Sequence, residues 1–71
     1  MNQQYTTLAE EFPRQQARCH EILARAQAIG PSGAFLAARL RQSLTRAARA
    51  AADGDLPAMI AALIDLRSYS D

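Results

Sequence analysis

Arginine is the residue type whose number and spacing suggest chemistry in this chain. Eight arginines and no lysine carry the basic charge. Arg39, Arg46 and Arg49, with Gln42 among them, recur at intervals of three and four, which places them on one face of a helix. A guanidinium group grips a carboxylate or a phosphate through two hydrogen bonds. The sequence therefore predicts a charged helix face suited to an acidic protein or to a nucleic acid.

A plainer interpretation of the arginines stays open beside this one. The net charge is only +1, which gives no general attraction for nucleic acid. Glu10–Arg14 and Glu21–Arg25 have the i,i+4 spacing of ordinary ion pairs. A solvated face that pairs with itself is the favoured interpretation, ahead of an acidic protein partner and then of nucleic acid.

The sequence contains few residues that could form a catalytic or metal-binding site. Cys19 and His20 are neighbours on an expected helix, so their side chains point about 100° apart and cannot form a nucleophile–base pair. We expect Cys19 to be a core thiol and His20 to face solvent. Asp53 and Asp55 flank Gly54 as turn and cap residues. With one cysteine and one histidine, a disulfide framework and a zinc finger are excluded, and we expect no catalytic residue, no metal and no cofactor.

The composition indicates an all-α fold. Alanine supplies 16 of the 35 hydrophobic residues and valine none, so helix formers dominate and β-branched residues are scarce. No stretch approaches the roughly 18 apolar residues of a membrane span, and no basic segment precedes an apolar run as in a signal peptide. We expect a small cytoplasmic protein with no membrane association.

Two glycine-containing breaks divide the 71 residues into three helices of one domain. The segment 29–33 holds two glycines and a proline, and the segment 53–55 centres on Gly54. The predicted helices span about 7–29, 32–52 and 55–68, and the short turns make a helical hairpin or three-helix arrangement. Thr7 and Glu10 fit a capping box. Pro13 is expected either to kink the first helix or to end a separate short turn.

Apolar residues recur at threes and fours in each segment. The predicted stripes are Phe12, Cys19, Ile22, Leu23, Ala26 and Ile29 in the first, and Phe35, Leu36, Leu40, Leu44, Ala47, Ala48 and Ala51 in the second.

The third segment has apolar residues on two sides. Met59, Leu63 and Leu66 form one side, and the other side holds Leu56, Ile60 and Ile64. One neighbouring helix cannot cover both sides, so we expect an oligomer, most simply a two-fold homodimer. The residues predicted to bind a partner or a second copy are Phe12, Leu36, Leu40, Leu44, Met59, Ile60, Leu63 and Leu66.

Aromatic residues near the chain ends allow two interpretations. Tyr5, Phe12 and Tyr69 are either staples of the bundle, the favoured interpretation, or anchors for a partner.

The sequence also suggests a test of the predicted oligomer. Leu63→Glu should weaken dimerisation and partner binding together.

Three stretches carry a resemblance to a known family. They are Tyr5-Thr6-Thr7-Leu8-Ala9-Glu10-Glu11-Phe12-Pro13-Arg14-Gln15-Gln16-Ala17-Arg18, Ile29-Gly30-Pro31-Ser32-Gly33-Ala34-Phe35 and Ala52-Asp53-Gly54-Asp55-Leu56-Pro57-Ala58-Met59. They cover most of the chain and resemble small helical early proteins of temperate, transposable phages, and in particular the phage quorum-sensing anti-activator family. These stretches are helix and turn signatures, and no contact residue is carried over from the family.

The resemblance implies a helical homodimer in the cytoplasm of an infected bacterium. It implies a non-enzymatic inhibitor that binds a host protein, either a LasR-like quorum-sensing regulator of the LuxR type or a type IV pilus assembly ATPase. The alternative is a small nucleic-acid-binding regulator that uses the face of Arg39, Arg46 and Arg49. A third possibility is a structural phage component, which would form large assemblies.

Overall fold

Three α-helices and one short 3₁₀ turn make up the fold. The computed structural model describes residues 7–70 and contains α1 (Leu8–Ile29), the turn η1 (Pro31–Gly33), α2 (Ala34–Asp53) and α3 (Leu56–Arg67). Within residues 7–70 there is no strand, which confirms the predicted all-α class. No helix end lies more than two residues from its predicted position.

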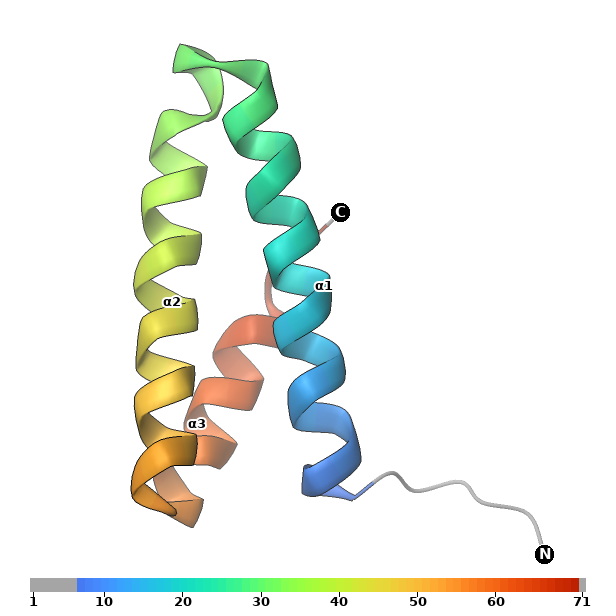
Figure 1. Cartoon of the computed structure of the whole chain (residues 1–71), viewed down its shortest axis with the longest axis vertical. Helices are drawn as coiled ribbons and strands as arrows, with labels where there is room; N and C mark the ends of the chain where they lie inside the picture. Colours follow the sequence, from blue (N-terminus) through green and yellow to red (C-terminus); the bar gives the residue numbers. More distant parts are fainter. Residues whose placement is uncertain (1–6, 71) are drawn as a thin grey trace, which may run out of the picture.

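The helices form a long hairpin with a shorter third member. Figure 1 shows α1 and α2 running antiparallel from the η1 end, with α3 folding back from the far end of α2 across about half of the hairpin. The last turn of α3 reaches the middle of α1, so the η1 end consists of α1 and α2 alone. None of the helices in residues 7–70 has the length and apolar character to cross a bilayer.

The start of α1 confirms the predicted capping box. The Glu10 amide donates to Thr7 Oγ1 at 3.2 Å, and the Thr7 amide donates to Glu10 Oε1 at 3.3 Å. The helix continues through Pro13, so the alternative of a separate turn before Pro13 is wrong. Pro13 has no amide hydrogen, so the helical hydrogen bond to the carbonyl of Ala9 is missing. Ala9 and Pro13 are both exposed near the end of the helix, where water can bond to that carbonyl.

The connection between α2 and α3 follows from two adjacent residues. Gly54 ends α2 in the left-handed conformation with φ 64°, which a glycine adopts without the steric penalty of a Cβ. Asp55 then caps α3, because its side chain accepts a hydrogen bond from the Ala58 amide at 3.1 Å. These two residues reverse the chain as predicted and set α3 against α2.

The connection between α1 and α2 brings the backbone of Gly33 into close contact with that of Ala26. Gly33 is buried, and a Cβ placed on it would overlap the carbonyl oxygen of Ala26. Glycine is therefore needed here for space rather than for its dihedral angles. The contact fixes how closely α1 and the start of α2 approach each other.

The core lies where all three helices meet. Leu40, Leu66 and Cys19 are its most completely buried large side chains. Leu8, Leu23, Met59, Leu63 and Tyr69 pack against it from its edges. The buried core cluster comprises Phe12, Cys19, Ile22, Leu40, Leu44, Ala47, Ala62 and Leu66.

The stripe predicted for α2 needs a correction. Phe35 is 77% exposed, and Ala48 and Ala51 are also exposed. Leu36 is exposed as well, and Ala37, Ser43 and Ala50 are buried although the stripe did not include them. Ser43 and Ala50 are buried because α3 lies on that side of α2. The stripe of α1 is as predicted except at Ile29, which is 64% exposed at the η1 end, beyond the reach of α3.

Candidate functional site

The outer side of α3 is an uncovered apolar surface. Leu56, Ile60 and Ile64 are 58%, 51% and 66% exposed. Their spacing of four residues aligns them along one side of the helix over successive turns. We call these three residues the apolar row. The sequence prediction of two apolar sides on α3 is confirmed, because Met59, Leu63 and Leu66 pack inward.

Contacts at the C-terminal end of α3 fix the rotation of the helix and so hold the apolar row outward. The Leu66 carbonyl accepts hydrogen bonds from Arg18 Nη2 at 3.0 Å and from Cys19 Sγ at 3.3 Å. The hydroxyls of Ser43 and Tyr69 are hydrogen-bonded at 2.8 Å. The last turn of α3 is therefore tied to both α1 and α2.

Only two of the eight predicted partner-binding residues lie on the exposed surface. Leu36 is 38% exposed at the η1 end, and Ile60 belongs to the apolar row. Half-buried Met59 and Leu63 pack against the core. The other four are buried inside the protomer and are corrected here to core residues: Phe12, Leu40, Leu44 and Leu66. A helical stripe in a sequence marks an apolar side, and it does not distinguish an internal neighbour from an external one.

Two of the aromatic residues near the chain ends, Phe12 and Tyr69, act as staples. Phe12 is 3% exposed within the core. The Tyr69 ring is half-buried, and the guanidinium carbon of Arg39 lies 5.9 Å from its centroid, a cation–π geometry. Tyr5 lies outside the described residues.

The predicted arginine face is divided by internal contacts. Arg39 covers Tyr69, and Arg46 Nη1 lies 3.7 Å from Asp65 Oδ2. Arg49 remains exposed without an ion pair in residues 7–70. The self-paired interpretation thus holds for part of this face.

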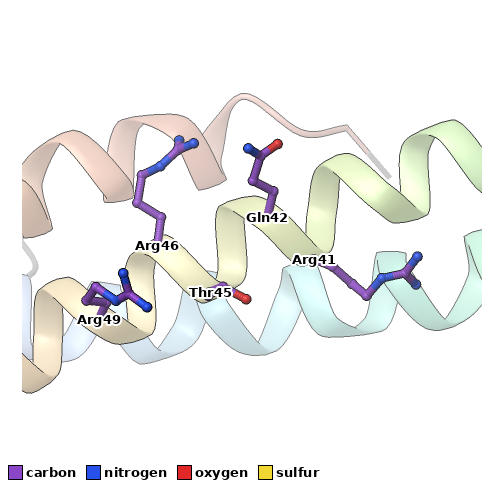
Figure 2. Close-up of a pocket in the computed structure, with 5 residues that line it drawn as sticks. All are labelled: Arg41, Gln42, Thr45, Arg46 and Arg49. Carbon is purple, nitrogen blue, oxygen red and sulfur yellow. The ribbon is translucent and has the colours of Figure 1, made fainter.

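A different group of arginines shares one depression on α2. This arginine hollow has a volume of about 410 Å³ and is lined by Arg41, Gln42, Thr45, Arg46 and Arg49. Figure 2 shows Arg46 and Gln42 extending on the side of α3 and Arg41 on the other side, with Thr45 between them. The sequence prediction missed Arg41, although its spacing of four and eight residues from Thr45 and Arg49 is a visible signal.

A second depression lies next to the first, between α2 and α3. This alanine hollow has a volume of about 300 Å³ and shares Arg46 and Arg49 with the arginine hollow. Alanines from both helices line it, namely Ala50, Ala58, Ala61 and Ala62, and acidic residues border it, namely Asp53, Asp55 and Asp65. Small side chains from both helices therefore line the contact of α2 with α3.

Asp65 stands out among the residues of the alanine hollow. Its Oδ2 atom is buried and has no hydrogen-bond partner in the described chain. The neighbouring guanidinium of Arg46, at 3.7 Å, supplies charge but no hydrogen bond to that atom. The atom is closed to solvent, and Arg46 lies close enough to balance its charge.

The ion pairs predicted on α1 need correction. Arg14 Nη1 lies 3.5 Å from Glu11 Oε1 rather than pairing with Glu10, because the Glu10 carboxylate is used by the capping box. The Glu21–Arg25 pair is not formed in the part of the chain that the structure describes.

Cys19 and His20 have different surroundings, as expected. Cys19 is fully buried, and His20 is exposed. Residues 7–70 contain no group of three or more histidine, cysteine, aspartate and glutamate side chains arranged to hold a metal ion.

The candidate site therefore consists of the apolar row on α3 and the two hollows along α2. The site offers exposed aliphatic side chains on α3 and guanidinium groups on α2. Comparison of the chain with protein families, with curated proteins and with solved structures found no match.

Proposed function

We propose that this chain is a non-enzymatic inhibitor that acts by binding other proteins through the apolar row. The observation that carries the proposal is the exposure of Leu56, Ile60 and Ile64 on one side of a twelve-residue helix. Single exposed apolar side chains are ordinary on protein surfaces. Three on successive turns give the helix an apolar side of the kind with which an amphipathic helix enters an apolar groove.

The energy available from this surface is large enough to matter. Full burial of a leucine or isoleucine side chain contributes about 1.5–3 kcal/mol. More than half of each side chain in the apolar row remains exposed, so covering all three contributes about 3–5 kcal/mol. Such a gain supports an interface when polar contacts at its rim add to it.

We propose two occupants for the apolar row, a second copy of the chain and a host protein. A two-fold homodimer is the simplest arrangement in which one apolar row covers another. The resemblance to phage anti-activators supports a bacterial host protein as the target, either a LasR-like regulator of the LuxR type or a type IV pilus assembly ATPase. Binding would then inhibit the target by occupying its surface.

The decisive variant is Ile60→Glu. Ile60 is the central residue of the apolar row, and a buried glutamate without a partner would strongly oppose any interface there. Leu63→Glu is the weaker test, because Leu63 packs against the core and its loss would also destabilise the fold. Phe35→Glu is a matched control, since Phe35 is 77% exposed on α2 and outside the apolar row.

Two measurements test the proposal. Sedimentation equilibrium reports the dimer, and binding to a purified LasR-like regulator and to a purified pilus assembly ATPase reports the target. We expect Ile60→Glu to abolish both interactions and Phe35→Glu to preserve them. A well-folded Ile60→Glu protein that dimerises and binds like the parent would refute the proposal.

Nucleic-acid binding is the second candidate function. The observation that favours it is that Arg41, Arg46 and Arg49 line one hollow together with two uncharged polar side chains. This candidate predicts binding of mixed duplex DNA that weakens steeply with salt. It also predicts that the combined Arg41→Ala, Arg46→Ala and Arg49→Ala substitutions abolish that binding. A fluorescence-polarisation titration that shows no binding at low salt would eliminate it.

A further inference from the structure

We propose that the arginine hollow and the alanine hollow form one continuous groove for a segment of a partner protein. That segment carries carboxylates one helical turn apart, followed by an apolar side chain. The inference rests on the proposed function, because it assigns a second contact surface to a protein-binding protein. It concerns α2 and its boundary with α3, and not the apolar row.

The first argument is the charge of α2. The helix carries four arginines, and its only acidic residue is Asp53 at its C-terminal end. Arg41 and Arg49 are exposed and form no ion pair in residues 7–70. Arg46 contacts Asp65 only at 3.7 Å, so most of its donors are available. Guanidinium groups with free donors favour an anionic occupant of the arginine hollow.

The second argument is the spacing of the charges. Arg41, Thr45 and Arg49 follow one another every four residues along one line of α2. Successive positions on such a line are about 6 Å apart. Arg41 and Arg49 are therefore two turns apart, with the uncharged Thr45 between them. Of two carboxylates one turn apart on a partner helix, one can meet a guanidinium group and the other the threonine hydroxyl.

The third argument is the apolar surface that continues from the arginines. Arg46 and Arg49 line both hollows, so an occupant that leaves the arginine hollow meets the methyl groups of Ala50, Ala58 and Ala61 next. A surface of methyl groups in a depression accepts an apolar side chain.

The acidic residues around the alanine hollow favour a protein segment over a nucleic acid. The phosphates of a nucleic acid repeat along the whole strand. A strand that followed the groove beyond Arg49 would meet the carboxylates of Asp53, Asp55 and Asp65. A protein segment can place its carboxylates over the arginines only and continue with apolar residues, so it matches the pattern of charge in the groove.

The probe for this inference is a fluorescein-labelled helical peptide with two glutamates four residues apart and a leucine one turn later. It is titrated with the full chain at low salt and read by fluorescence anisotropy. We expect saturable binding that weakens at least about tenfold when both glutamates are replaced by glutamine. Mixed duplex DNA of the same label is titrated in parallel.

Two variants separate the two parts of the groove. Arg41→Gln with Arg49→Gln removes the unpaired guanidinium groups, and its matched control is Arg25→Gln with Arg67→Gln, both exposed and outside the hollows. Ala61→Leu fills the alanine hollow from an exposed position, and Ala24→Leu on α1 is its control. We expect each groove variant to weaken binding of the peptide at least about tenfold and each control to change its affinity less than about twofold.

The inference is overturned if the peptide does not bind saturably. It is also overturned if the duplex binds more tightly than the peptide and Ala61→Leu has no effect on binding of the duplex.

Failure of this inference is distinguishable from failure of the proposed function. If Ile60→Glu abolishes target binding while the groove variants leave it intact, the apolar row stands and the groove is wrong. If the groove variants weaken binding of the peptide while Ile60→Glu still binds the target, the inference about the groove stands and the function proposed for the apolar row is wrong.

Discussion

The two sides of α3 have similar residues and different surroundings. Met59, Leu63 and Leu66 pack toward α1 and α2, whereas Leu56, Ile60 and Ile64 remain more than half exposed. The difference comes from the last turn of α3, where the contacts of Leu66 and Tyr69 hold one rotation of the helix. The inner side is therefore expected to determine stability, and the outer side is available for binding.

Leu66→Ala should have the largest effect on the inner side. Leu66 is fully buried, and truncation of a buried leucine leaves a cavity that costs about 3 kcal/mol. The free energy of unfolding from urea denaturation measures this change. Ile64→Ala is the outer counterpart and should cost less than about 1 kcal/mol. Equal losses at the two positions would contradict the assignment of inner and outer sides.

Tyr69→Phe removes one of the contacts that set the rotation of α3. The substitution keeps the ring that Arg39 covers but leaves the buried Ser43 hydroxyl without its partner. We expect a loss of about 1–2 kcal/mol in the free energy of unfolding. The double variant Ser43→Ala with Tyr69→Phe should recover part of that loss, because no unpaired hydroxyl then remains. An unchanged stability in Tyr69→Phe would mean that this hydrogen bond does not orient α3.

Asp55→Ala acts on the start of α3, which both sides share. Loss of the side-chain acceptor for the Ala58 amide should cost about 1 kcal/mol. Thermal unfolding followed by circular dichroism measures the shift in Tm. Asp53→Ala is the control, since Asp53 is the last residue of α2 and caps no helix start. A similar shift in both variants would indicate a charge effect rather than the loss of a cap.

Replacement of Leu56, Ile60 and Ile64 by glutamine should have the smallest effect on stability. Each substitution at an exposed helix position should change the free energy of unfolding by less than about 0.5 kcal/mol. Dimerisation and target binding, measured on the same samples, should be lost. A loss of several kcal/mol in the dilute monomer would show that the outer side contributes to the fold itself.

Local signals were sufficient to predict the helices. The capping box of Thr7 and Glu10, the left-handed Gly54 and the cap at Asp55 involve residues within a few positions of one another. The rotation of α2 could not be predicted in the same way. Ser43 is buried because it bonds to Tyr69, 26 positions away, and a single-helix pattern contains no information on that contact.

The candidate site was predictable to a smaller extent. The two apolar sides of α3 follow from spacing alone, but the sequence does not say which side the hairpin covers. Four residues assigned to a partner surface are core residues for that reason. The groove on α2 depends on the approach of α3, which supplies Asp65 and three of the four alanines, so its composition requires the tertiary structure.

The contacts at Leu66 also bear on the order of folding. Arg18 and Leu66 are 48 positions apart, whereas the turn at Gly33 joins segments that are neighbours in sequence. Closing a long loop costs more chain entropy than closing a short one. The α1–α2 and α2–α3 connections are both short, so we expect these two hairpins to form before the contacts between α1 and α3.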